Sequence, residues 1–308
     1  MKKTIWGITV SALMFGTMEI ALKIGGTKLD PVQMTFLRFL IGGFVLLPFS
    51  VPETRERMRA MAEAEGRQVR LREVLPVRDI LWMLLLGMVG ISFSMLFFQL
   101  GVERCNASTA APLMSTNPLF TMLIAHLLTS EKMDKLKWVA FAVGVAAIFF
   151  MIRPWDVQEG NTVAGIVFMI IAATSFGLYT VMGKRTIGRL GLFTQTSISF
   201  ILGSFVLLLI MLISGRPVIA GVADNLIVVL YCGIMVTGVG YLFYFIGVKY
   251  SDATTGSLTF YIKPVIAPVL AVLILHEKVY WNTVVGIALL VTASAITLYD
   301  TKKRTEIS

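Results

Sequence analysis

One pattern occurs twice in this sequence, 146 positions apart and without a gap between its landmarks. In residues 101–132 and again in 247–278, a Gly-Val pair is followed by an Ala, then by a polar residue before a Pro, and finally by Glu-Lys. Pro118 therefore corresponds to Pro264. This duplication predicts a chain built from two related halves.

The match continues toward the start of each half with a different offset. Gly16 matches Gly177 and Gly42 matches Gly203, both 161 positions apart, so that the first half carries 15 extra residues. These fall in the loop at 51–78. Each half holds five expected helices, and an odd number turns the second copy upside down relative to the first.

The composition places these helices in a membrane. The chain is 56% hydrophobic and only 15% charged, with a mean hydropathy of +0.82, whereas soluble domains are about 25% charged. Apolar runs approach the roughly 20 residues that a helix needs to cross a bilayer. Ten helices are expected, at 4–24, 32–50, 79–102, 108–129, 136–152, 161–183, 193–214, 225–248, 254–276 and 282–299.

The predicted fold is thus an all-α polytopic membrane protein with ten transmembrane helices as two inverted five-helix repeats. The first repeat is expected at 1–153, with a cytoplasmic loop at 51–78. The second is expected at 160–301, followed by a cytoplasmic tail at 302–308. The first apolar segment resembles a secretory signal, but its internal counterpart indicates a retained span.

Lysines and arginines give the orientation. With the amino terminus inside, 19 of them lie at inner ends and 6 at outer ends, which predicts that both termini are cytoplasmic. The formal charge of +9 does not indicate nucleic-acid binding, because the basic residues lie between spans rather than on one soluble face. Loop 51–78 is interpreted as a solvated, partly helical connector; a regulatory or lipid-binding role is the alternative.

Three charged residues lie far from the ends of expected spans, namely Glu19, Arg38 and Lys263. A charge near the bilayer centre costs on the order of 2.5–3.5 kcal/mol on insertion scales, so such residues are functional candidates. Glu19 and Arg38 lie at similar depth on adjacent helices and are expected to form an ion pair, which either locks the helices or takes part in binding. Lys263 lies near the middle of its helix; the alternative to a binding role is snorkelling to an interface.

Among the prolines inside expected helices, Pro118, Pro264 and Pro268 are the candidate hinge residues. Each removes a backbone hydrogen bond and kinks its helix. The favoured interpretation is a hinge that lets the helix bend between inward-open and outward-open states. A kink used only for packing is the alternative.

The two halves also differ, and the differences suggest substrate chemistry. Features that both halves share, such as Glu131 and Glu277, are interpreted as architectural. Polar residues without a counterpart are candidate substrate ligands: Lys263 replaces Asn117, and Tyr261 and Gln99 also differ between the halves. No enzyme motif, metal-ligand spacing or cofactor motif is found, so an intramembrane enzyme and a channel are less favoured than a transporter.

The chain resembles the EamA-type transporters of the drug/metabolite transporter (DMT) superfamily. Three segments carry the resemblance: Leu37-Arg38-Phe39, Asn117-Pro118 through Glu131, and Tyr261-Ile262-Lys263-Pro264 through Glu277. The resemblance implies export of amino acids, related metabolites or amphipathic compounds. Many similar chains carry an acidic residue where this one has Lys263, which favours a substrate with an anionic group.

These observations predict a secondary active transporter that exports amino acids or related small metabolites across the plasma membrane by alternating access. A multidrug or organic-cation exporter is the alternative. Lys263 and Arg38 would attract an anionic group, Glu19 would bind an ammonium group or a coupling proton, and Tyr261, Asn117 and Gln99 would orient the substrate. Expected partners are a small-molecule metabolite, membrane lipids and protons as a candidate coupling ion, without nucleic acid or cofactor, in a monomer or homodimer.

Overall fold

The computed structural model describes residues 2–25, 28–129, 131–153, 155–249 and 253–307. Within these ranges, the side chains of 2–5, 247–249, 253–261, 298 and 301–307 lie outside the description.

The described chain is almost entirely helical, and all ten expected ranges fall on helix. Its main helices are α1 (Lys2–Gly16), α2 (Met18–Ile24), α3 (Pro31–Glu65), α4 (Leu71–Val74), α5 (Val77–Gly87), α6 (Leu96–Arg104), α7 (Ala107–Met114), α8 (Asn117–Leu128), α9 (Lys135–Ile152), α10 (Val163–Leu190), α11 (Leu192–Ile213), α12 (Leu226–Leu230), α13 (Gly240–Lys249), α14 (Ala253–Leu275) and α15 (Trp281–Ile307). A short 3-10 turn, η3 (Ala223–Asn225), precedes α12.

By length and composition, eight described helical stretches can cross a membrane. Two further described apolar stretches, Ile262–Leu275 and Trp281–Thr297, are shorter because neighbouring side chains are not described. An all-α polytopic membrane protein is thereby confirmed.

Two of the expected helices are discontinuous. The first is broken at Thr17, whose hydroxyl lies 2.9 Å from Met14 O and 2.6 Å from the Tyr231 hydroxyl. The fourth is broken at Ser115 and Thr116, between α7 and α8. Pro118 therefore lies in the first turn of α8 and not inside a helix as predicted. The first turn tolerates proline because its N–H groups have no intrahelical partner.

The third and eighth spans each contain a π-helical segment, which the sequence analysis did not predict. These segments are η2 (Met88–Met95), between α5 and α6, and η4 (Tyr231–Val239), between α12 and α13. The two segments occupy corresponding places in the two halves, because adding the offset of 146 to the residue numbers of η2 gives a range that overlaps η4. Segments of this kind are often found at functional sites, and both of these reach the cavity described below.

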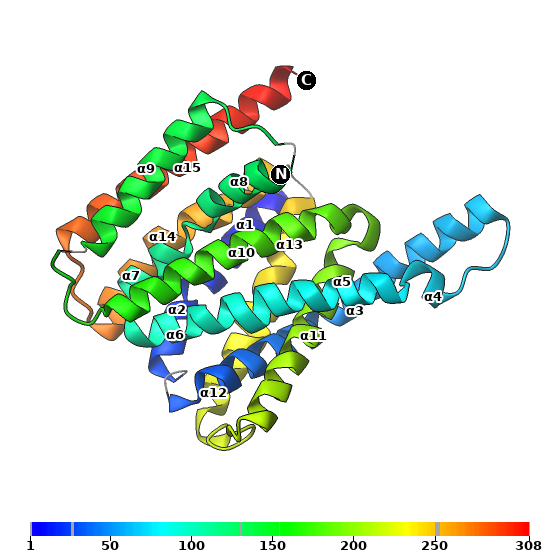
Figure 1. The fold of residues 1–308 in the computed structure, drawn as a ribbon, viewed down its shortest axis with the longest axis horizontal. Helices are drawn as coiled ribbons and strands as arrows, with labels where there is room; N and C mark the ends of the chain where they lie inside the picture. Colours follow the sequence, from blue (N-terminus) through cyan, green and yellow to red (C-terminus); the bar gives the residue numbers. More distant parts are fainter. Residues whose placement is uncertain (1, 26–27, 130, 154, 250–252, 308) are drawn as a thin grey trace.

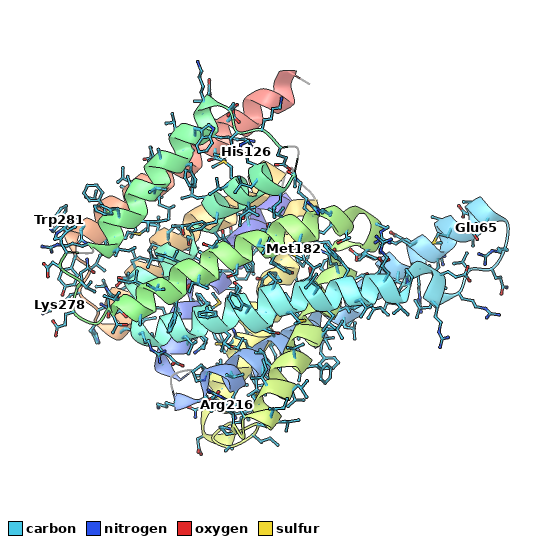
Figure 2. All side chains as sticks on the ribbon, in the orientation of Figure 1. Glu65, His126, Met182, Arg216, Lys278 and Trp281 are labelled. Carbon is cyan, nitrogen blue, oxygen red and sulfur yellow. The ribbon has the colours of Figure 1, made fainter. Side chains whose placement is uncertain are left out.

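The helix α3 continues well past its expected end at residue 50. It reaches Glu65 and protrudes from the bundle, as Figures 1 and 2 show. The residues after Pro52 are mainly Glu, Arg, Met and Ala, which favour helix. Gly66 ends it with a positive φ of 63°, a conformation that glycine adopts easily. Most of loop 51–78 is thus helical.

Exposed ion pairs surround the tip of this protrusion. Arg67 lies 2.5 Å from Glu65 and 2.6 Å from Glu73. Its hydrogen bond lowers the pKa of the Glu73 carboxyl below the usual value. Exposed pairs of this kind contribute little stability, so the tip has the character of a solvated connector.

Pairs of helices from different parts of the sequence pack along one another. The helix α3 packs along α11, and α9 along α15. In Figure 1 the α9–α15 pair lies along one side of the bundle, while α10 crosses the middle next to α6 and α8. The helices α1, α13 and α14 pack together behind them.

Two pairs of glycines let helix backbones approach closely. The duplication relates the two pairs, because Gly87 corresponds to Gly233 and Gly203 corresponds to Gly42. Gly87 faces Gly203, where a Cβ on Gly203 would lie 2.6 Å from the Gly87 carbonyl oxygen. Gly233 faces Gly42, where a Cβ on Gly42 would lie 3.3 Å from the Gly233 carbonyl oxygen. Small residues at such crossings allow the close packing on which helix association in membranes depends.

We expect Gly203→Val to destabilise the protein by about 1–3 kcal/mol, because an added side chain must push the Gly87 backbone away. Thermal unfolding in detergent measures the loss. The control is Gly188→Ala, since a Cβ on Gly188 would meet no atom within 4 Å. Equal stability of the two variants would show that the crossing is not tightly packed.

Candidate functional site

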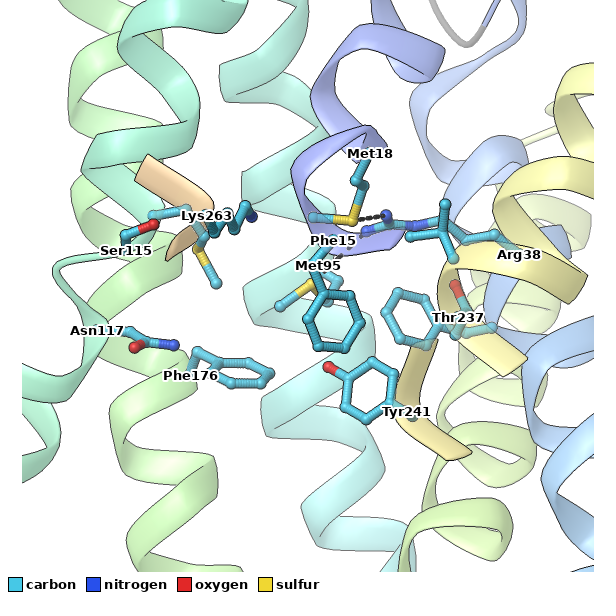
Figure 3. Close-up of a pocket in the computed structure, with 13 residues that line it drawn as sticks. Phe15, Met18, Arg38, Met95, Ser115, Asn117, Phe176, Thr237, Tyr241 and Lys263 are labelled. Atoms are coloured by element: carbon cyan, nitrogen blue, oxygen red, sulfur yellow. Dashed lines mark hydrogen bonds between the residues drawn. The ribbon is translucent and has the colours of Figure 1, made fainter. Parts of the chain in front are cut away.

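A small cavity lies in the middle of the bundle, where several broken or π-helical segments meet. Its wall combines two cations, a few polar side chains and many apolar ones (Figure 3). The cations are Arg38 from α3 and Lys263 from α14, and the polar residues include Ser115 and Asn117 at the α7–α8 break. The cavity volume is about 40 Å³, room for about three water molecules at roughly 10–15 Å³ each.

The Lys263 ammonium is paired with the Glu19 carboxylate. Lys263 Nζ lies 2.6 Å from Glu19 Oε1, and the two side chains are 6% and 0% exposed. The break at Thr17 places Glu19 in the first turn of a new helix, α2, which packs against α14. The expected Glu19–Arg38 pair is therefore wrong: no such pair exists within the described structure, and Lys263 takes the place of Arg38.

Arg38 has the largest fully buried side chain among the described residues. Its two terminal nitrogens lie 3.3 Å from Met18 Sδ and 3.6 Å from Met95 Sδ, and Nε has no hydrogen-bond partner in the described part of the chain. Figure 3 shows the guanidinium between the two thioethers. It also lies 4.7 Å from the ring centroid of Phe39 and 5.4 Å from that of Phe98.

This environment leaves the positive charge of Arg38 only weakly compensated. A thioether sulfur is a weak acceptor, and a cation over an aromatic ring gains about 0.5–2 kcal/mol. Several kcal/mol are needed to bring one ion from water into a protein interior. Arg38 is therefore a buried positive charge that a bound oxyanion would stabilise strongly.

Aromatic rings line the remaining wall of the cavity. Phe15 and Tyr241 meet edge to face with ring centroids 5.1 Å apart, and Phe176 lies on the side of Asn117 (Figure 3). The Tyr241 ring continues to Phe200, also at 5.1 Å. Sequence reasoning considered Tyr241 as a stacking surface, with a core position as the alternative, but it did not single out the phenylalanines and thioethers because such residues are abundant everywhere in this chain.

The other predicted site residues are divided between the cavity and its surroundings. Asn117 lines the cavity at the start of α8, whereas Gln99 is buried on α6 beside Glu103 and does not line it. The side chain of Tyr261 lies outside the described residues. Of the candidate hinge residues, Pro264 and Pro268 are buried inside α14.

Hydroxyl groups satisfy backbone carbonyls at the α7–α8 break. Ser115 Oγ donates to Ala111 O at 2.8 Å and Thr116 Oγ1 donates to Leu113 O at 2.6 Å. At membrane depth, an irregular backbone is tolerated only where protein or a wet cavity surrounds it. These residues are almost completely buried, and Ser115 lines the cavity, so the break is part of the site.

One end of the same bundle is closed by a carboxylate, Glu277, which follows α14. It accepts hydrogen bonds from Ala107 N at 2.8 Å, Ser108 N at 2.9 Å and Ser108 Oγ at 2.7 Å. Glu277 thus caps the N-terminus of α7, where a negative charge is favourable. This cap ties the end of the ninth span to the start of the fourth.

The arrangement of a polytopic helix bundle around a buried, charged cavity is that of a membrane carrier, and comparisons with known proteins give its family. The model of the EamA-like transporter family matches residues 2–153 and 163–299. An uncharacterized transporter of Clostridium kluyveri is 34% identical over 100% of this chain and 96% of its own. The chain belongs to the EamA-like transporter family and is a multi-pass membrane transporter.

More distant relatives agree with this class. An S-adenosylmethionine uptake transporter of Rickettsia prowazekii is 24% identical, with 92% of this chain and 88% of its own covered. A solved crystal structure has the same fold, with a TM-score of 0.64 and 19% identity over 98% of both chains.

Proposed function

We infer that this protein is a secondary active transporter of the plasma membrane that exports amino acids or related small metabolites carrying an anionic group. In this proposal both termini are cytoplasmic, as the distribution of 19 inner and 6 outer basic residues indicates. The two repeats move around the central cavity by alternating access. Arg38 receives the anionic group, and Lys263, Glu19 and Asn117 contribute to the same site.

The observation that carries the proposal is the buried guanidinium of Arg38. It lines a central cavity but pairs with no carboxylate in the described part of the chain. Buried charges are otherwise paired, because an unpaired one is costly. A substrate anion that comes and goes explains why the protein keeps this cation without a permanent partner.

Two features support alternating access. The cavity beside Arg38 has a volume of only about 40 Å³, so a substrate can be accommodated there only after the helices move. The Glu277 cap joins the fourth and ninth spans at one end, and in the proposed orientation this end is the outer one. Release of the substrate to the outside would then break this cap.

We predict that Glu277→Ala opens the outer end more often. Loss of a helix cap costs about 0.5–2 kcal/mol, which changes a two-state opening equilibrium by a factor of about 2–30. Cys105, which is buried two residues before α7, is a natural reporter. Its labelling by a membrane-impermeant maleimide in whole cells is expected to accelerate by this factor.

The variant Cys105→Ser in the Glu277→Ala background separates this signal from labelling of Cys232, which is buried within η4. Unchanged labelling of Cys105 would count against Glu277 as part of an outer gate.

The proposed function itself is tested by transport. The full-length protein is reconstituted in proteoliposomes that are preloaded with one unlabelled compound, and the uptake of the same compound in radiolabelled form is measured. The compounds are amino acids, organic anions, organic cations and sugar nucleotides. Counterflow of an amino acid or a related anion, inhibited by unlabelled substrate, supports the proposal. Counterflow of hydrophobic cations alone would instead identify a multidrug exporter and would overturn the role of Arg38.

A proton is the proposed coupling ion. Glu19 is the buried carboxylate closest to the cavity cations, and a proton is the ion that it would bind. Acceleration of counterflow by an imposed pH gradient, lost in Glu19→Gln, is the expected result. The orienting roles of Tyr261 and Gln99 and the state as monomer or homodimer stay predictions.

A further inference from the structure

The charges around the cavity do not balance. Two cations, Arg38 and Lys263, face it, and one carboxylate, Glu19, lies directly beside them. Because Glu19 is already engaged by Lys263 at 2.6 Å, these two charges cancel. The positive charge of Arg38 remains without an ionic partner among the described side chains.

The guanidinium of Arg38 donates no hydrogen bond to an oxygen atom in the described part of the chain. Both of its terminal nitrogens point at thioether sulfurs, at 3.3 and 3.6 Å, and Nε has no described partner. A guanidinium presents its donors in a planar fork that fits the two oxygens of a carboxylate. The rings of Phe39 and Phe98 hold the fork in place.

Met18 and Met95 are suited to make way for such a ligand. Methionine is unbranched and adapts its shape to irregular space, and both residues line the cavity. An entering oxyanion would replace their sulfurs on Arg38. The same displacement would enlarge a cavity that now has room for only a few water molecules.

An ammonium group finds no corresponding place. Glu19 does not line the cavity; its Oε1 pairs with Lys263, and its Oε2 is buried. A substrate ammonium would have to displace Lys263 and leave that cation unpaired at membrane depth, where an isolated charge is expensive. The rest of the wall is mainly aromatic and aliphatic, including Phe15, Phe176 and Tyr241.

We propose that the substrate is a small organic monoanion with an apolar body and no ammonium group, bound through its oxyanion to Arg38. This inference rests on the proposed function and selects, from amino acids and related metabolites, the acids that lack the amino group. One oxyanion neutralises the one uncompensated charge, and the aromatic wall accepts the body. Arg38 is then the residue that determines specificity.

The test uses ligands that share a body and differ only in charge. One set is 3-phenylpropanoate, phenylalanine and 2-phenylethylamine, and the other is 4-methylpentanoate, leucine and 3-methylbutylamine. Affinities for the purified full-length protein are measured by calorimetry, and counterflow is measured in proteoliposomes. We expect the acid of at least one set to bind at least tenfold more tightly than its amino acid, and the amine not to bind.

Two variants assign this selectivity to Arg38. In Arg38→Met the acid is expected to lose at least 100-fold in affinity, whereas Arg38→Lys, which keeps the charge but loses the planar fork, loses less. Arg216→Met is the matched control, because Arg216 lies on an exposed loop and pairs with Asp30 at 2.7 Å. The control is expected to bind like the unchanged protein.

Each other outcome overturns the inference. If both amino acids bind as tightly as their acids or more tightly, the monoanion proposal fails while amino-acid export stands. If an acid binds equally well to Arg38→Met, the anion site is elsewhere. If none of the six ligands binds, the proposal also fails, and the proposed export function fails with it if the wider transport panel is negative.

Discussion

Lys263→Met is expected to destabilise this protein by about 3–5 kcal/mol, because breaking a buried ion pair leaves the other charge uncompensated. Glu19 is fully buried, and its Oε1 lies 2.6 Å from Lys263 Nζ. Its Oε2 has no hydrogen-bond partner within the described structure, so no neighbouring donor would take over the role of Lys263. Thermal and denaturant unfolding in detergent measure the loss.

The double variant Glu19→Met/Lys263→Met is expected to recover most of this loss. Replacing both partners of a buried pair by apolar side chains of similar volume is often neutral or stabilising. The four proteins of this double-mutant cycle give the coupling energy of the pair. A double variant that is as unstable as Lys263→Met would show that Lys263 acts through contacts other than Glu19.

An exposed ion pair provides the comparison. Lys184 Nζ lies 2.5 Å from Glu131 Oε1, but the side chains are 73% and 46% exposed. Exposed pairs contribute about 0–1 kcal/mol, so Lys184→Met is expected to change stability by no more than this. The contrast tests whether burial, and not the short distance, makes the Glu19–Lys263 pair important.

Arg38→Met is expected to have the opposite effect and stabilise the unliganded protein by about 1–3 kcal/mol, since it replaces a buried, poorly compensated charge by an apolar side chain. The cation–aromatic contacts with Phe39 and Phe98 that are lost contribute less than the relieved desolvation. The unfolding transition in detergent is expected to move upward while transport is abolished. Such a trade between stability and activity is typical of functional sites.

The matched control for this variant is Arg104→Met. Arg104 also lies near an aromatic ring, 5.5 Å from the Phe168 centroid, but its side chain is 42% exposed. Its replacement is expected to change stability by no more than about 0.5 kcal/mol. If Arg38→Met were strongly destabilising, Arg38 would have a compensating partner, and its role as a vacant anion site would be contradicted.

Several features of the fold follow from sequence alone because they are repeated or periodic. The gapless match between 101–132 and 247–278 and the long apolar runs are sufficient to predict the all-α membrane fold and its ten helical ranges. The glycines that match across the halves, such as Gly42 and Gly203, lie at close helix crossings. Hydrophobic length and repetition are local properties that need no knowledge of the neighbours.

Helix continuity was less predictable. The apolar runs do not distinguish α-helical turns from the π-helical turns of η2 and η4, because the same types of residue occur in both. At the break before Pro118, the hydroxyls of Ser115 and Thr116 donate additional hydrogen bonds to carbonyls that also accept backbone N–H groups. The extension of α3 to Glu65 is supported from outside the helix, where Glu53 accepts hydrogen bonds from the first turn of α11.

The sequence by itself determined which charges enter the membrane, because only Glu19, Arg38 and Lys263 interrupt the apolar spans at depth. Only the tertiary structure decided how they pair. A break at Thr17 and the packing of α14 against α2 bring Lys263 to Glu19, and Arg38 is left between two thioethers and two rings. Pairing depends on distances of a few ångströms between residues far apart in the chain, which helix spacing and depth cannot specify.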